Sequence, residues 1–170
     1  DSEKFMTRLI CGPYLKGYEE VTIKYQDSKV YGKLLSSLRH TMGFEVVNQS
    51  EGRCMIKELV QGDEQNFEKL IIRLFNVLRS FATELNKYLK KPYEDINSLL
   101  EIEYTCDKLS LYCKRLVNKD LVSGKTYDNT AMYHIVALAE QVGDELRQIA
   151  QFFKKKGHKN FKYNVEFDDL

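Results

Sequence analysis

Three amphipathic segments follow one another between residues 63 and 157, and they constrain the fold more than any other feature of the sequence. In each segment, apolar residues recur at intervals of three and four, the period of an α-helix with one buried face. The first segment has the broadest apolar face, formed by Phe67, Leu70, Ile71, Leu74, Phe75, Leu78, Phe81, Leu85 and Tyr88. Because a helix with one apolar face must cover it against a neighbour, the pattern predicts an antiparallel three-helix bundle.

Breaks between the segments mark where the helices end. Pro92 ends the first helix and begins the second, since proline lacks the backbone N–H that a helix interior requires. The second helix is predicted over residues 93–118, and the turn at Ser123-Gly124 follows it. The third is predicted over residues 128–156, with lysines in its last turn and Gly157 as its stop.

The first 61 residues change period several times and predict a small α/β module. Alternating β-formers in residues 18–25 indicate a strand, and a helix capped by Asp27 or Ser28 and ended by Gly43 follows. Residues 44–48 and 53–59 read as a hairpin. A weak helix before the first strand, in residues 7–16, should be broken or bent at Gly12-Pro13.

The predicted fold is therefore mainly α. It has a β-α-β-β module in residues 1–61, a three-helix bundle in residues 62–157, and a tail or the start of another element in residues 158–170.

Charge and composition exclude several classes of function. There are 26 basic and 25 acidic residues, so the net charge of +1 produces no field that would attract nucleic acid, and we expect no direct nucleic-acid binding. No apolar run approaches the ~18 residues that span a membrane, and no leader-like segment opens the chain, so we expect no membrane insertion and a cytoplasmic location. None of the four cysteines forms a Cys-x-x-Cys pair, which predicts free, buried thiols.

An acidic signature occurs twice, as Glu103-x-x-x-Asp107 in the second helix and Glu140-x-x-x-Asp144 in the third. Residues four apart lie one above the other on a helix, and both pairs fall on the same side of their helix's apolar stripe. If the stripes pack together, four carboxylates gather along one seam and need a cation to offset their repulsion. The spacing therefore predicts a metal site with oxygen ligands, which suit hard or borderline ions.

Other interpretations of these residues are weaker. The four acids also fit ordinary exposed ion pairs, each contributing well under ~1 kcal/mol. A di-iron oxidase needs Glu-x-x-His, but Cys106 and Gly143 stand at the histidine positions. No serine or cysteine has a histidine and an acid arranged by motif for nucleophilic catalysis, so we expect no enzymatic activity.

Two basic motifs are also better explained without a ligand. Ser123-Gly-Lys-Thr126 imitates the end of a phosphate-binding loop, but Lys119 stands where that motif needs its first glycine, so an interhelical turn is favoured. A basic cluster at the end of the third helix is read as a solvated helix end rather than a phosphate-binding surface, and it comprises Lys154, Lys155, Lys156, His158, Lys159 and Lys162.

Several stretches resemble the PhoU family of phosphate-uptake regulators. Leu138-Ala-Glu-Gln-Val-Gly-Asp144 resembles the acidic signature of the family's third helix, and Glu101-Ile-Glu-Tyr-Thr-Cys-Asp107 resembles its partner motif. Tyr14-Leu-Lys-Gly-Tyr-Glu-Glu-Val-Thr-Ile and Met42-Gly-Phe-Glu-Val-Val are similar to the segment that precedes the helices in archaeal members. The sequence departs from the family pattern at Gln141, where arginine is usual, and at Glu145, where histidine is common.

The resemblance implies a non-enzymatic regulator whose metal ligands are Glu103, Asp107, Glu140 and Asp144, with iron or zinc as the metal. It implies partners among the components of a phosphate transporter and its sensor kinase. Family members usually carry two bundles and this chain has one, so we expect either a piece of a longer protein or a single bundle that pairs with a copy of itself as a homo-oligomer, in the simplest case a homodimer. The alternative is a helical dimerisation or interaction module of an ion-transport or transcription regulator, with acids that bind no metal.

Overall fold

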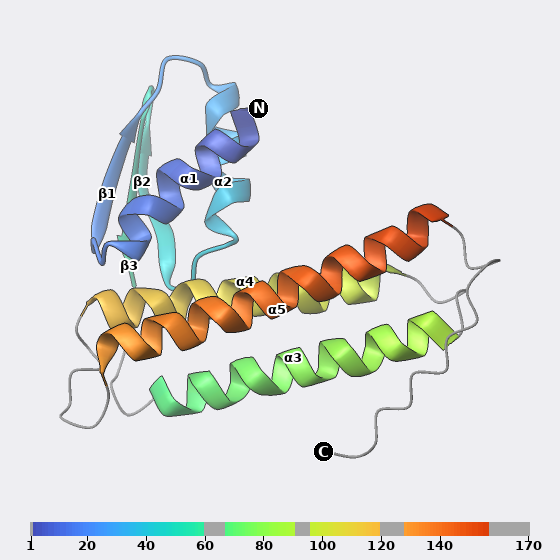
Figure 1. The fold of residues 1–170 in the computed structure, drawn as a ribbon. Coiled ribbons are helices and arrows are strands. Elements are labelled where there is room, and N and C mark those ends of the chain that lie inside the picture. The colour runs from blue at the N-terminus through green and yellow to red at the C-terminus, as the bar shows by residue number, and fades with distance from the viewer. Residues whose placement is uncertain (1, 60–66, 91–95, 120–127, 157–170) are drawn as a thin grey trace.

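The structure is a computed structural model that describes residues 2–59, 67–90, 96–119 and 128–156 (Figure 1). Within these residues, 73% are helical, and a small three-stranded antiparallel sheet accompanies the helices, which confirms the mainly α prediction. The elements in chain order are α1 Ser2–Leu15, β1 Glu20–Lys24, α2 Lys29–Leu38, β2 Phe44–Ser50, β3 Arg53–Glu58, α3 Phe67–Lys90, α4 Ile96–Asn118 and α5 Asn129–Lys156.

The sheet has the order β1-β3-β2, and both pairings are antiparallel. The predicted strands and hairpin are present, and the helices α1 and α2 lie on one side of the sheet (Figure 1). Side chains that β1 and β3 turn towards these helices are buried, among them Ile23, Cys54 and Ile56. The predicted helix between the first two strands is shorter than expected: α2 ends at Leu38, whose carbonyl accepts a hydrogen bond from the Thr41 hydroxyl, well before Gly43.

The first helix corrects a prediction, because α1 runs through Pro13 instead of breaking there. Pro13 removes one helical hydrogen bond, the one its N–H would donate to the carbonyl of Leu9, but the burial of Ile10 and Tyr14 holds this part of the helix in place. The chain leaves the helix at Gly17, which has a φ of +83°. The N–H groups of Gly17 and Tyr18 donate to the carbonyls of Tyr14 and Pro13, the two hydrogen bonds of a Schellman cap. The glycine, not the proline, ends this element.

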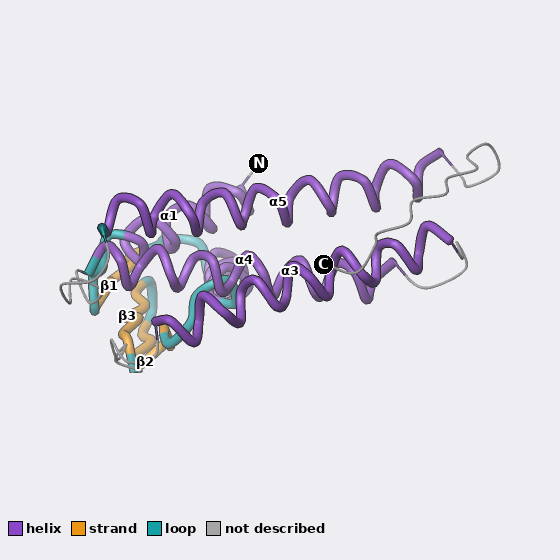
Figure 2. The backbone as a smooth tube through the Cα atoms, turned by 60° about the horizontal axis from the view of Figure 1, so that its bottom comes forward, coloured by secondary structure: helices purple, strands orange, loops and turns teal. Residues whose placement is uncertain are grey.

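The helices α3, α4 and α5 pack against one another, and α4 runs opposite to the other two (Figures 1 and 2). Their described bounds agree closely with the segments predicted from periodicity. The predicted core position Phe75 is wrong, because this residue is 48% exposed, and Ile135 on α5 is likewise 40% exposed. Each lies at the edge of its apolar face, where the sequence pattern does not distinguish a covered flank from an open one.

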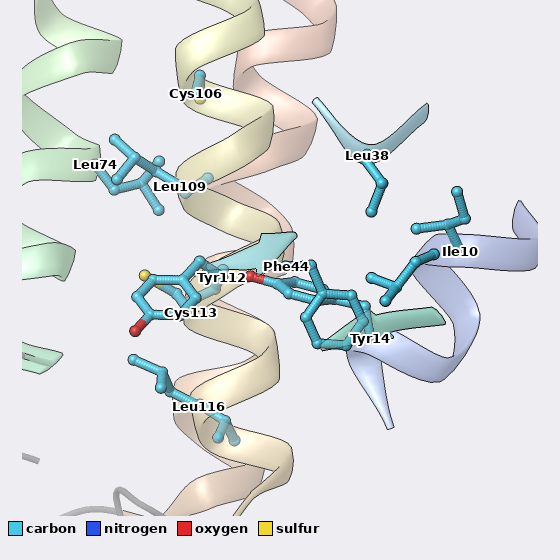
Figure 3. Close-up of a cluster of buried hydrophobic side chains, with 14 of the residues drawn as sticks. Ile10, Tyr14, Leu38, Phe44, Leu74, Cys106, Leu109, Tyr112, Cys113 and Leu116 are labelled. Atoms are coloured by element: carbon cyan, nitrogen blue, oxygen red, sulfur yellow. The ribbon is translucent and has the colours of Figure 1, made fainter. Parts of the chain in front are cut away.

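One hydrophobic core crosses the predicted boundary near residue 61. Buried residues of α1 and the sheet, such as Tyr14 and Phe44, join buried residues of α3 and α4, such as Leu74 and Leu109 (Figure 3). A second cluster lies at the far end of the long helices and includes Phe81, Leu85 and Leu99.

A buried arginine fixes α4 against the N-terminal module. Arg115 is fully buried, and its Nη2 lies 2.6 Å from Glu58 Oε2 on β3. The same guanidinium donates hydrogen bonds to the carbonyls of Tyr14 and Tyr18. Lys119 adds a second cation 2.9 Å from the Glu58 carboxylate. These polar contacts hold α4 in a defined position beside the sheet, and α4 in turn carries the candidate site.

Candidate metal centre

Three of the four predicted acids come together between α4 and α5. Glu103 and Asp107 lie one turn apart on α4, and Asp144 approaches them from α5, so that one carboxylate oxygen from each lies within 4.8 Å of the others. The close approach of the helices depends on Gly143, because a Cβ at this position would lie 3.2 Å from the Sγ of Cys106. A residue without a side chain therefore stands next to Asp144 where α5 meets α4.

The fourth predicted acid is not part of this group. The Glu140 carboxylate forms an ion pair with the ammonium of Lys114, two turns further along α4 from Asp107. The Lys114 side chain is only 12% exposed. Glu140 thus has a cation of its own, and the acidic cluster consists of Glu103, Asp107 and Asp144.

Arg147 is a member of the site that the sequence motifs did not identify. Its Nη2 donates a hydrogen bond to Asp144 Oδ1 at 2.6 Å, and its Nε lies 3.0 Å from Glu103 Oε1. The contact to Glu103 is an ion pair without hydrogen-bond alignment, and the buried Nε has no hydrogen-bond partner. Arg147 lies three residues after Asp144 on the same side of α5, and this i,i+3 spacing was the available signal.

The single arginine does not balance the three acids. Burial, together with the neighbouring charges of Glu103, Asp144 and Glu140, raises the pKa of Asp107 to about 7. Burial also raises the pKa of Glu103, against the opposing effect of Arg147. The Asp107 carboxyl group shares a hydrogen bond with Glu103. At pH values below about 7, a proton on the Asp107 carboxyl group therefore offsets part of the missing positive charge.

The donor set fits a metal ion with oxygen ligands. An ion bonded to oxygens at about 2.1 Å holds adjacent ligands roughly 3.0–3.4 Å apart, so the three carboxylate oxygens, which lie within 4.8 Å of one another, would draw closer around a bound ion. A thiolate ligand is not available from Cys106, because burial raises the pKa of this thiol to about 12. The chemistry of the site thus favours a hard or borderline ion over a soft one.

A cleft gives solvent access to one side of the site. Its volume is about 1040 Å³, and it lies between α2 and β2 on one side and α4 and α5 on the other. Glu103 and Arg147 belong to its wall, as does Tyr104, whose hydroxyl donates to the carbonyl of Arg39. Other charged side chains along the cleft are Arg39, His40, Glu45, Glu101 and Lys108.

Several further sequence predictions have a structural outcome. Cys54, Cys106 and Cys113 are free and buried as expected, whereas Cys11 is only partly buried. The segment 123–126 and the part of the basic cluster beyond Lys156 lie outside the described residues. Among the helices that the structure describes, none is both long enough and apolar enough to cross a bilayer.

The chain matches no protein-family model, no curated protein and no solved structure. The PhoU resemblance therefore stays a prediction from the sequence motifs.

Proposed function

We propose that this chain is a metal-binding, non-enzymatic regulator of phosphate uptake that resembles one PhoU domain. The observation that carries the proposal is the meeting of Glu103, Asp107 and Asp144 between two helices. These acids belong to the two motifs on which the family resemblance rests. Further support comes from the order of elements, in which a small sheet module precedes three long helices that run up, down and up.

The metal in this proposal is held by the three clustered carboxylates, with Glu140 as an additional ligand only if it leaves Lys114. When bound, the ion supplies positive charge that offsets carboxylate repulsion and links α4 to α5. Iron is the better match to an all-oxygen donor set, and zinc is the alternative that the resemblance implies.

Arg147 already supplies part of the positive charge that a bound metal would bring to the cluster. Its guanidinium lies against both Glu103 and Asp144, so an incoming ion competes with it for the same oxygens. Release of Arg147 into the adjoining cleft changes the charge of a surface that borders α2 and β2. We infer that metal occupancy alters this surface, which contacts the phosphate transporter components and the sensor kinase that the resemblance implies as partners.

Metal binding is tested by elemental analysis of the purified protein. We expect iron, zinc or another ion with the wild type and none with Glu103→Gln combined with Asp144→Asn, together with a lower melting temperature for the wild type after chelation. Glu51→Gln combined with Glu68→Gln is the matched control, because it removes two exposed acids that belong neither to the acidic cluster nor to the cleft. A metal-free wild type whose melting is unaffected by added iron, zinc or chelator contradicts a metal centre and favours the interaction-module alternative.

Regulation of phosphate uptake is tested separately in the host cell. We expect that deleting the gene changes phosphate uptake, that the wild type and the control variant restore it, and that the site variant does not. Unchanged uptake in the deletion strain contradicts the regulatory role and leaves the result on metal binding intact.

A further inference from the structure

The outer side of α5 carries a row of exposed apolar side chains. The opposite side of α5 faces α4, as the ion pairs of Glu140 with Lys114 and of Arg147 with Glu103 demonstrate. The exposed apolar residues are between 40% and 61% accessible, and they are Ile135, Leu138, Val142, Ile149 and Phe152. With Glu145 they follow spacings of three and four, the 3.5-residue period of a seam between two packed helices.

Helix α3 extends this apolar surface with Ile72 and Phe75, which are 60% and 48% exposed. Gly143 of α5 packs beside Leu78 of α3, and the two helices run in the same direction (Figure 1). Counting back along both helices from this contact, Ile72 and Phe75 fall level with residues 137–140 of α5. The flank of α3 that faces α4 is a different one, because Val77 borders a hollow shared with α4. Phe75 projects roughly 160° around the helix from Val77.

The seven side chains form what we call the outer stripe, and its area reaches the upper end of the range found on monomeric proteins. If a fully exposed side chain of this kind presents about 180 Å² on average, the exposed fractions leave roughly 600 Å² of apolar surface. The largest apolar patch of a typical monomer is about 300–600 Å². A stable interface of standard size buries about 800 Å² on each partner, so the outer stripe with a polar rim is sufficient for one.

We propose that the outer stripe is a homodimer interface in which the α5 helices of two copies pack antiparallel across a two-fold axis near Val142. A two-fold interface needs one patch that matches itself, and the repeated apolar spacing of α5 provides this match. The net charge of +1 imposes little repulsion between copies. The antiparallel arrangement also brings the exposed Lys154 and Lys155 of one copy near Asp128 of the other. The dimer does not depend on the metal centre, which lies on the opposite side of α5.

Sedimentation velocity at micromolar concentrations tests this proposal. We expect a wild-type dimer with or without chelator, and a dissociation constant at least about 100-fold weaker for Leu138→Glu combined with Val142→Glu, because the charges would be buried without partners. The matched control is Phe5→Glu, which changes an equally exposed apolar residue on α1. It should remain a dimer. Circular dichroism checks that every variant keeps its helices.

A cross-linking measurement keeps the proposal testable if the charged variant does not fold. Val142→Cys should form a disulfide-linked dimer on mild oxidation, and the wild type, with three buried cysteines and a partly buried Cys11, should not. A monomeric wild type overturns the proposal, including one that binds lipid vesicles or another protein through this face. A dimer that survives the charged substitutions, or a Val142→Cys protein that does not cross-link, also overturns it.

Discussion

Two charge clusters that involve α4, one buried and one partly exposed, differ in their balance of charge. At the junction with the sheet, two cations, Arg115 and Lys119, contact the buried carboxylate of Glu58, and Lys119 also contacts the exposed Glu19. The second cluster lies about two turns closer to the start of α4, around Asp107. There the single cation Arg147, from α5, contacts two of three clustered carboxylates. The first cluster is complete within the described chain, and the second has a deficit of positive charge.

The pKa values of the acids reflect this difference. Burial alone would raise the pKa of Glu58, but hydrogen bonds from Arg115 and Lys119 outweigh it and hold the pKa below its ordinary value. Burial and the adjacent acids together raise the pKa of Asp107 to about 7. A compensated cluster, whose acids all have cation partners, helps to hold the folded structure in place. An uncompensated cluster, which has too few cations, lowers the stability of the folded state until a proton or a cation binds to it. The comparison thus separates a structural ion pair from a candidate binding site.

The largest expected effect comes from breaking the compensated cluster. Arg115→Met should lower the free energy of unfolding by about 3 kcal/mol, because Glu58 loses its main partner and two backbone carbonyls lose their donor. Urea denaturation at neutral pH measures the change. Adding Glu58→Leu to this variant should recover most of the loss, since an apolar pair of similar volume avoids the unpaired charge. A single variant as stable as the wild type would contradict a structural role for this ion pair.

A smaller effect of opposite sign is expected in the uncompensated cluster. Asp107→Asn should stabilise the metal-free protein by about 2 kcal/mol at pH 8, because the buried carboxylate no longer has to ionise. The pKa of this acid is raised in the folded state, so its destabilising contribution is absent below its ordinary value of 3.8, grows as the pH rises, and is complete above about 7. Denaturation across this range should show a weaker pH dependence for the variant than for Glu101→Gln. Identical pH profiles would show that Asp107 ionises normally.

Long-range pairing explains which features the sequence did and did not predict. Strong periodicity over more than twenty residues located α3, α4 and α5, because the pattern and the packing have the same cause. The acids Glu103, Asp107 and Asp144 were found because each motif is local and the helices pack through the predicted stripes. Gly17 ended α1 through backbone geometry that the more conspicuous Pro13 obscured.

The counter-ions escaped prediction for a physical reason. Lys114 is 26 residues from Glu140, and Arg115 is 57 residues from Glu58, so no local pattern joins either pair. From the sequence alone, a charged residue such as Arg115 is expected to be exposed. It is buried because the N-terminal sheet packs against this part of α4. Charge balance, which distinguishes a structural cluster from a candidate site, thus depends on the packing of distant segments.

The smallest expected effect tests whether Arg147 competes with a metal. Arg147→Met removes the cation from a cluster that already lacks positive charge, so the metal-free protein should lose about 1 kcal/mol of stability, a modest value because the arginine is one-third exposed. The same substitution should raise the affinity for iron or zinc about tenfold, since the ion no longer displaces a guanidinium from Glu103 and Asp144. Calorimetric titration measures both proteins under the same conditions, and Arg79→Met on α3, away from the acids, is the control. Weaker metal binding by Arg147→Met would mean that the arginine positions the carboxylates instead of competing for them. The shortage of positive charge would then not be the cause of metal binding at this cluster.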